Sequence, residues 1–119
     1  VQGNQNYFFG DDMSDLADYA WYKTNSDETT HAVAQLQPIP IAGNNFYDLY
    51  GNVSEWGHDS LQYIHLYGEN VVGKTTNYHS VRGGSWKLPH GNLKCCYQQC
   101  FTSHLRNSDI GFRLVRTIK

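Results

Sequence analysis

Hydrophobic and polar residues alternate in short stretches along this chain, and the spacing changes from one stretch to the next. Apolar side chains recur three or four positions apart in the first such stretch, which predicts a short amphipathic helix over 12–23. Asp12 is suited to cap its start, because a carboxylate there accepts a free backbone N–H of the first turn. Farther along, Asn52 is followed by Glu55, and this capping-box pattern predicts a second, single short helix.

Other stretches have the two-residue period of β-strands. Alternation predicts a short strand over 31–37, a strand over 80–86 and a terminal strand over 110–118. The segment 93–101 fits a strand or a helix, and periodicity does not decide between them. Residues 58–80 are rich in turn-forming residues and predict a long excursion.

Composition narrows the fold class. The chain of 119 residues is long enough for one domain with a modest core, and only 17% of its residues are charged. Aromatic residues are frequent, and the polarity comes mainly from amide, hydroxyl and glycine residues. This balance favours a loop-rich α+β domain, with short strands and one or two short helices, over a helical bundle.

Charge, hydropathy and cysteine usage bear on partners and location. The formal net charge is −2 and no basic run is present, which argues against nucleic acid as a partner. No apolar run approaches the length of a membrane span, so we expect no membrane partner. The three cysteines are an odd number in one short window, which indicates reduced thiols and a cytoplasmic location rather than a disulfide framework.

Three segments carry a resemblance to one known family. They are YFFGDDMSDLADYAWYKTNSDETTHAV at 7–33, FYDLYGNVSEW at 46–56, and VRGGSW at 81–86 followed by IGFRLVR at 110–116. In this order and at this spacing, they are similar to motifs of the formylglycine-generating-enzyme, or sulfatase-modifying-factor, family. The resemblance implies a C-type-lectin-like fold of the α+β class, held together by buried aromatic residues and bound calcium.

The resemblance covers the C-terminal half of the family's domain. We therefore expect residues 1–119 to form a single domain that is either truncated or shortened. The same observation raises the alternative that a partner chain supplies the missing half. The resemblance also implies that Trp56, Trp86 and Phe112 are core residues, in agreement with the burial that large aromatic side chains usually have.

The second motif implies a calcium site. By resemblance, its ligands are two carboxylates and two backbone carbonyls, namely those of Asp48, Glu55, Gly51 and Val53. Oxygen ligands of these kinds suit calcium. Without the resemblance, the simpler interpretation is that Asp48 is a solvated turn residue and that Glu55 caps a helix. A second family site draws on the region that contains Asn25 and Asp27, which are the available candidates there.

Oxidising members of this family bind copper(I) between two cysteine thiolates, which are suitable soft ligands. The resemblance places those positions at Leu88 and Leu93, so neither holds a thiol and copper is not expected. With a two-residue loop insertion, the resemblance would instead place Cys95 at the second position and Cys100 at a structural cysteine of the family, while the first position would still hold no thiol. Cys95 and Cys100 are also catalytic candidates as a pair, because a two-thiolate site is geometrically feasible across a helical turn or bulge. The scattered histidines form no metal-binding pair in the sequence.

Another branch of the family uses the scaffold for display, with a binding surface between the RGGSW and GFR motifs. Here that segment carries aromatic, amide and basic side chains suited to ligand contact, namely Lys87, His90, Asn92, Tyr97, Gln99, His104 and Arg106. The simpler interpretation of this segment is a solvated loop.

Our leading hypothesis is a non-catalytic, calcium-binding scaffold that binds a protein or a small-molecule ligand. The alternative is an oxidoreductase, either formylglycine-generating or similar to iron(II)-dependent sulfoxide synthases. A fragment of such an enzyme, which needs its N-terminal half, belongs to the same alternative.

Overall fold

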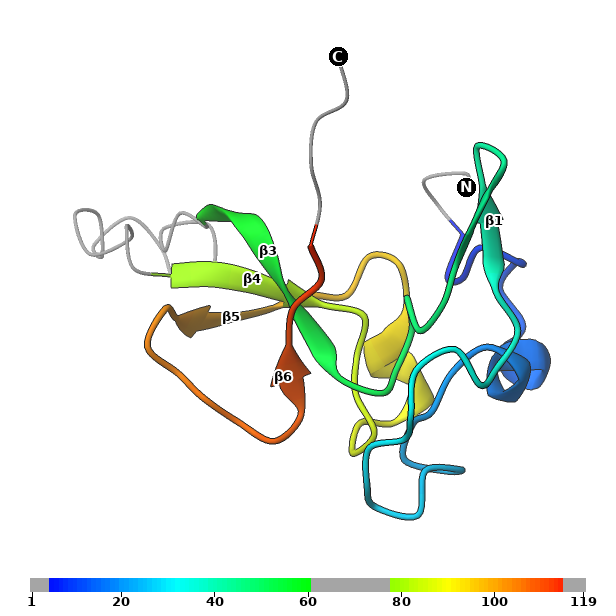
Figure 1. Ribbon diagram of the computed structural model, residues 1–119, viewed down its shortest axis with the longest axis horizontal. Coiled ribbons are helices and arrows are strands. Elements are labelled where there is room, and N and C mark those ends of the chain that lie inside the picture. The colour runs from blue at the N-terminus through cyan, green and yellow to red at the C-terminus, as the bar shows by residue number, and fades with distance from the viewer. Residues whose placement is uncertain (1–4, 61–77, 115–119) are drawn as a thin grey trace.

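The computed structural model describes residues 5–60 and 78–114 (Figure 1). In chain order, the elements of this part are η1 (Met13–Asp18), β1 (Ile39–Ile41), β2 (Asn44–Phe46), β3 (Ser54–Ser60), β4 (Tyr78–Arg82), η3 (His90–Leu93), β5 (Gln99–Thr102) and β6 (Ile110–Gly111). Both helices are short 3-10 helices, and loops connect most elements. The expected loop-rich α+β architecture is confirmed. Most of the predicted excursion over 58–80 lies outside the described residues.

The larger sheet has four strands in the order β5-β4-β3-β6, and it lies apart from η1 and the β1–β2 hairpin (Figure 1). β4 pairs antiparallel with both β3 and β5, whereas β6 pairs parallel with β3. The β3–β6 pairing sets Gly111 opposite Glu55. As a result, the last described residues lie next to the second sequence motif, where the candidate site forms.

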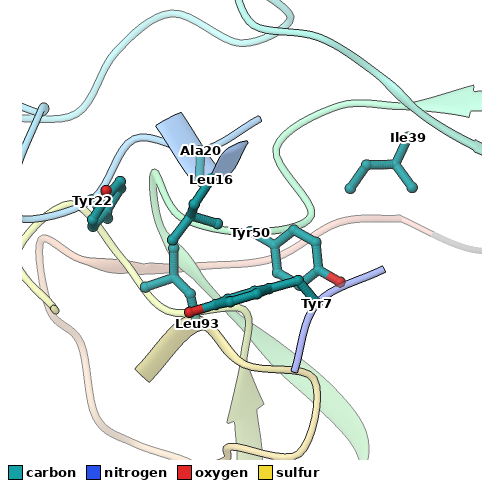
Figure 2. Packing of buried hydrophobic residues seen from close by; sticks show 7 residues of the cluster. All are labelled: Tyr7, Leu16, Ala20, Tyr22, Ile39, Tyr50 and Leu93. Atoms are coloured by element: carbon teal, nitrogen blue, oxygen red, sulfur yellow. The ribbon is translucent and has the colours of Figure 1, made fainter. Parts of the chain in front are cut away.

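The hydrophobic core joins segments that are far apart in the sequence. Figure 2 shows Tyr7 crossing Tyr50, and the two rings meet edge to face with centroids 6.0 Å apart. Leu16 from η1 and Leu93 from η3 are fully buried in the same cluster. The Tyr7 hydroxyl donates to the backbone carbonyl of His90 at 2.9 Å, so its polar end has a partner inside the core.

The first predicted helix is confirmed at its start and wrong at its end. Asp12 caps η1, because its carboxylate accepts the backbone N–H of Ser14 at 2.9 Å. The helix ends at Asp18 instead of continuing through residue 23. Beyond it, Trp21 pairs with Gly51 in an isolated β-bridge. This tertiary pairing overrides the helical spacing of the apolar residues.

The predicted helix after Asn52 is wrong, because β3 begins at Ser54. Asn52 has a φ of 64°, whereas a residue that caps a helix start has extended backbone geometry. Its side-chain amide instead accepts the His31 N–H at 3.0 Å and donates to the His31 carbonyl at 2.9 Å. The side chain is therefore committed to a distant loop, and Glu55 lies in a strand rather than in a helix cap.

The predicted strand over 31–37 is also wrong, since these described residues form turns and bends. Ala34 has a φ of 62° and donates its backbone N–H to Asp48 Oδ2 at 3.0 Å. The N–H of Gln37 donates to the carbonyl of Asp18 at 2.9 Å. The backbone of this loop is thus bound to a side chain and a helix end, not to a neighbouring strand.

The remaining predicted elements are displaced or shorter than expected. The strand predicted over 80–86 corresponds to β4, which ends before the glycine pair. In the segment 93–101, η3 ends at Leu93, β5 begins at Gln99, and residues 94–98 form a turn and loop between them. The terminal strand predicted over 110–118 has two residues in β6, and residues beyond 114 lie outside the description.

Two of the three aromatic residues expected in the core are half-buried, and the third is exposed. Trp56 and Trp86 are partly covered, but Phe112 is 73% exposed, so its predicted core position is wrong. Phe112 follows directly after the end of β6, and the sheet therefore gives it no continuing strand on which to pack.

Candidate functional site

A cavity of about 400 Å³ lies between the second motif and the residues that follow β6. All four predicted calcium ligands line it, namely Asp48, Gly51, Val53 and Glu55. The wall also includes Val33, Phe46, Phe112 and Arg113. The four predicted ligands thus share one cavity, whose wall also carries apolar side chains and a guanidinium.

Arg113 organises one side of the cavity. Its Nε and Nη2 donate to the two carboxylate oxygens of Glu55 at 2.8 and 2.7 Å. Nη2 also reaches the backbone carbonyls of Tyr47 and Asp48, at 2.9 and 3.1 Å. The hydrogen bonding to Glu55 raises the pKa of Arg113 despite partial burial. This bidentate pair is a charge-assisted contact that fixes the orientation of both side chains.

Asp48 occupies a more unusual position. The residue is only 9% exposed, and its φ of 58° is left-handed, which aspartate tolerates better than most residues. Oδ2 accepts the Ala34 N–H, but Oδ1 is buried and has no hydrogen-bond partner within the described part of the chain. A buried acceptor without a partner is unfavourable, so this oxygen marks a place where a donor or a cation would stabilise the protein.

The residues fit the predicted calcium site only in part. Asp48 Oδ1 is available, and Gly51 and Val53 line the same cavity. Both oxygens of Glu55, however, are occupied by Arg113, whose positive charge opposes a divalent cation at that carboxylate. Calcium binding by these four residues therefore stays a prediction, and Arg113 would compete with calcium for Glu55.

The second predicted calcium region has no comparable orphaned oxygen among its described candidates. The Asn25 side chain accepts the Tyr22 N–H at 2.8 Å and donates to the Ala20 carbonyl at 2.9 Å, so both of its ends are engaged. Asp27 is exposed. Within the described ranges, no three His, Cys, Asp or Glu side chains are grouped as a metal site would need.

The two positions that the resemblance assigns to the family's paired thiolates belong to the core. Leu93 is fully buried, and Leu88 packs against the same cluster. Cys95 directs its sulfur to the Tyr50 hydroxyl, with 3.1 Å between Sγ and the oxygen. Burial raises the pKa of the Cys100 thiol, which favours the neutral thiol over the thiolate that copper(I) requires.

The predicted ligand-binding residues lie on η3, β5 and the loops around them. Exposed members are Lys87, His90, His104 and Arg106, and half-buried members are Asn92, Tyr97 and Gln99. Lys87 Nζ lies 3.5 Å from the Asp109 carboxylate. None of the seven residues lines the 400 Å³ cavity, although Cys95 of the same segment contacts Tyr50 of the second motif.

Sequence reasoning missed Val33, Phe112 and Arg113 as cavity residues. The GFR part of the last motif was the available signal for Arg113, but nothing in its spacing pointed to Glu55. Only the parallel pairing of β6 with β3 brings the two side chains together. Val33 carries no sequence signal of this kind, because it lies in a loop that the alternation pattern assigned to a strand.

Comparisons with known protein sequences agree with the motifs. Residues 2–118 match the family described as the sulfatase-modifying factor enzyme 1-like domain. The serine/threonine-protein kinases Pkn1 of Chlamydia trachomatis and Chlamydia pneumoniae are each 31% identical, over 100 and 99 residues. These matches cover 79% and 78% of this chain but only 16% and 15% of the kinases. The chain thus spans about a sixth of these curated relatives.

Comparisons with solved structures support the same conclusion. Variable protein 1 of Treponema denticola is 26% identical with a TM-score of 0.72, and the match covers 92% of this chain and 40% of that protein. The crystal structure of CarF is 32% identical with a TM-score of 0.65, covering 87% of this chain and 34% of CarF. No helix of the described residues is long and apolar enough to cross a membrane. The motifs, the C-type-lectin-like fold and the match over 2–118 agree, and the chain belongs to the family of the sulfatase-modifying factor enzyme 1-like domain.

Proposed function

We propose that this chain is a non-catalytic binding domain of the sulfatase-modifying-factor family. The observation that carries the proposal is the role of Leu93. At a position that the resemblance assigns to a copper-binding thiolate, Leu93 is instead fully buried in the core, with Leu88 packed beside it. These two positions serve packing, and Cys95 is hydrogen-bonded to Tyr50.

The experiment that tests the absence of catalysis uses copper(I), oxygen and a Cys-x-Pro-x-Arg peptide. We expect no aldehyde in the peptide by mass spectrometry, with an oxidising family member as the positive control. Aldehyde formation by this chain would reject the non-catalytic proposal in favour of the oxidoreductase. If aldehyde appeared and Cys95→Ala or Cys100→Ala abolished it, the thiols would be identified as the reactive groups.

The proposed ligand surface is the segment from Lys87 to Arg106, which is supported by its exposed basic side chains and the half-buried Tyr97. A double variant, His104→Ala with Arg106→Ala, changes two exposed residues of this surface. On an array of peptides and small molecules, we expect probes that bind the wild-type chain to lose binding to the double variant. Asp15→Ala, an exposed change on η1, is the matched control. If every bound probe tolerates the double variant, the ligand surface lies elsewhere.

Calcium remains a predicted ligand of this domain. A ligand that binds only the folded state stabilises it by about 2.7 kcal/mol at a concentration of 100 times its Kd. Calcium chloride should therefore raise the melting temperature, and Asp48→Asn and Glu55→Gln should each remove that rise. An unchanged melting temperature at 10 mM calcium would count against the prediction.

A second candidate is that a partner polypeptide supplies the missing half of the domain. It is favoured by three exposed large apolar side chains, of Val33, Phe112 and Leu114 (75%, 73% and 87% exposed), two of which line one cavity. Purification from the native source would test it. A stoichiometric partner chain supports the candidate, whereas a longer native chain that carries the missing half, or a lone 119-residue monomer, rejects it. A cytoplasmic location stays a prediction.

A further inference from the structure

The charges that line the 400 Å³ cavity do not balance. Its wall contains the carboxylates of Asp48 and Glu55 and the guanidinium of Arg113, which leaves a single net negative charge. The hydrogen bonds of Arg113 go to Glu55 and to two backbone carbonyls, and none goes to the Asp48 carboxylate. Asp48 is therefore the acidic group of this wall that lacks a hydrogen-bonded cation.

The unpartnered oxygen belongs to this same carboxylate. Asp48 Oδ1 is buried without a hydrogen-bond partner among the described residues, while Oδ2 is bound to the Ala34 N–H. A charge-assisted hydrogen bond from a cationic N–H group would satisfy it. Such a ligand adds one positive charge without competing with Arg113 for Glu55, whereas a calcium ion that uses both carboxylates would compete with it.

The rest of the wall suits an apolar stem behind that cationic group. Phe46 is half-buried, and Val33 and Phe112 are exposed at 75% and 73%. Lysine and arginine bury their methylene stems against such surfaces while the charged end reaches a polar partner. The aromatic rings at this wall also attract a cation that approaches their faces.

A second hollow shares lining residues with the cavity, which favours a polypeptide over a free amine as the ligand. The two hollows share Ala34 and Tyr47, and the second is lined by Leu36, Pro38 and Asp18 among others. We call these two neighbouring hollows the groove, and a ligand that occupied both would need more length than a single side chain has. Its second part again combines apolar residues with an acidic residue.

We infer that this groove binds a partner polypeptide that inserts a lysine or arginine side chain toward Asp48, with apolar neighbours against Val33 and Phe112. The inference rests on the proposal that a partner polypeptide covers this face, and it adds the chemistry of one contact.

The test compares three capped peptides by calorimetry on the full chain. They are acetyl-Leu-Lys-Leu-amide and its analogues with norleucine or glutamate in the central position. We expect the lysine peptide to bind at least about tenfold more tightly than the norleucine peptide, because a hydrogen bond to a charged group contributes that much. The glutamate peptide should bind more weakly than either.

Two variants separate the charge from the apolar wall. Asp48→Asn should remove the preference for lysine and still fold, because asparagine accepts a positive φ and its amide oxygen can take the Ala34 N–H. Asp15→Asn, an exposed acidic control on η1, should keep the preference. Phe112→Ala should weaken the binding of the lysine peptide and of the norleucine peptide to the same extent.

Several outcomes would overturn the inference. The inference is wrong if the lysine and norleucine peptides bind equally tightly, or if the Asp48→Asn variant still prefers the lysine peptide. If n-butylammonium binds as tightly as the lysine peptide, the site takes free amines and the polypeptide assignment is wrong. If calcium displaces the peptide and Asp48→Asn abolishes calcium binding, the cation of this cavity is calcium.

This test also separates the inference from the partner candidate. A partner that copurifies with the native chain, together with no binding of the lysine peptide, rejects the inference alone. Tight binding of the lysine peptide to a chain that is natively a lone monomer rejects the partner candidate alone, and the chemistry of the groove stands.

Discussion

The aromatic core and the cavity face contain similar residue types, but they differ in how far their side chains are buried and hydrogen-bonded. In the core, Tyr7 and Tyr50 pack edge to face, and the hydroxyl of each has a hydrogen-bond partner (Figure 2). On the cavity face, Phe112 is largely exposed and one carboxylate oxygen of Asp48 lacks a partner in the described chain. The described residues close the core, whereas they leave the cavity face open.

The difference shows how the fold separates stability from recognition. Burial of apolar side chains stabilises a protein roughly in proportion to the area removed from water, so the closed core is where stability concentrates. Exposed apolar side chains around an unsatisfied polar group contribute little to folding and are available to a ligand. Substitutions in the two regions should therefore have different effects, and four such experiments test the comparison.

Truncation in the core should have the largest effect. Leu93→Ala removes a fully buried side chain, and we expect the free energy of unfolding to fall by about 2–5 kcal/mol. Leu114→Ala, at a position that is 87% exposed, should change it by less than about 0.5 kcal/mol. Urea denaturation measures both. Similar losses in the two variants would contradict the contrast between core and open face.

A substitution at the backbone contact between Gly51 and Trp21 should have the next largest effect on the free energy of unfolding. A Cβ at Gly51 would overlap the backbone carbonyl oxygen of Trp21, and the φ of 77° adds left-handed strain. Gly51→Ala should lower the free energy of unfolding by about 2–4 kcal/mol. Gly43→Ala is the matched control, because its φ is 82° with no atom nearby, and it should cost about 1 kcal/mol. Equal losses of stability in the two variants would show that left-handed backbone strain, and not the overlap with Trp21, causes the effect.

The ion pair at the cavity should have a smaller effect. Arg113→Met leaves Glu55 unpaired, and the loss should be about 1–2 kcal/mol, since both side chains are partly solvated. Arg106→Met, on an exposed loop, should be neutral within about 0.5 kcal/mol. Thermal unfolding of the two variants, measured in parallel with the wild-type chain, distinguishes their effects on stability. If Arg113→Met left the stability unchanged, the Arg113–Glu55 pair would orient side chains of the cavity without stabilising the fold.

The alkaline pH dependence should be the smallest effect and should come from the core. Burial raises the pKa of Tyr7 and of Tyr50, so the folded state holds these protons more tightly than the unfolded state. The stabilisation is complete below the unfolded pKa of about 10 and is lost as pH rises above it, by less than about 1 kcal/mol per tyrosine near pH 10.5. Tyr50→Phe should flatten this decline in urea titrations, whereas Phe112→Ala should leave it unchanged.

Local chemistry made some of the fold predictable. Asp12 caps η1 as expected, because an N-cap needs only the residues beside it. The turn that contains Asp48 and Gly51 was identified as a site by its motif, and the structure places a cavity there. The motifs also indicated the family, which the match over residues 2–118 shows.

Other predictions failed where a distant partner competed with a local pattern. Asn52 and Glu55 have the spacing of a capping box, but Asn52 binds the backbone of His31 and Glu55 binds Arg113. These partners are 21 and 58 positions away along the chain, and no periodicity reports them. The same cause ended the first helix early, because Trp21 pairs with Gly51.

The amino-acid sequence by itself determined the family, the loop-rich α+β class and the loss of thiols at positions 88 and 93, since these depend on residue identity and short spacing. Only the tertiary structure decided which carboxylate is neutralised and which is left without a partner. Glu55 meets Arg113 because β6 lies parallel to β3, and Asp48 faces the same cavity with one oxygen unpaired. Charge balance at a site depends on distances in space, and those are set by strand pairing between remote segments.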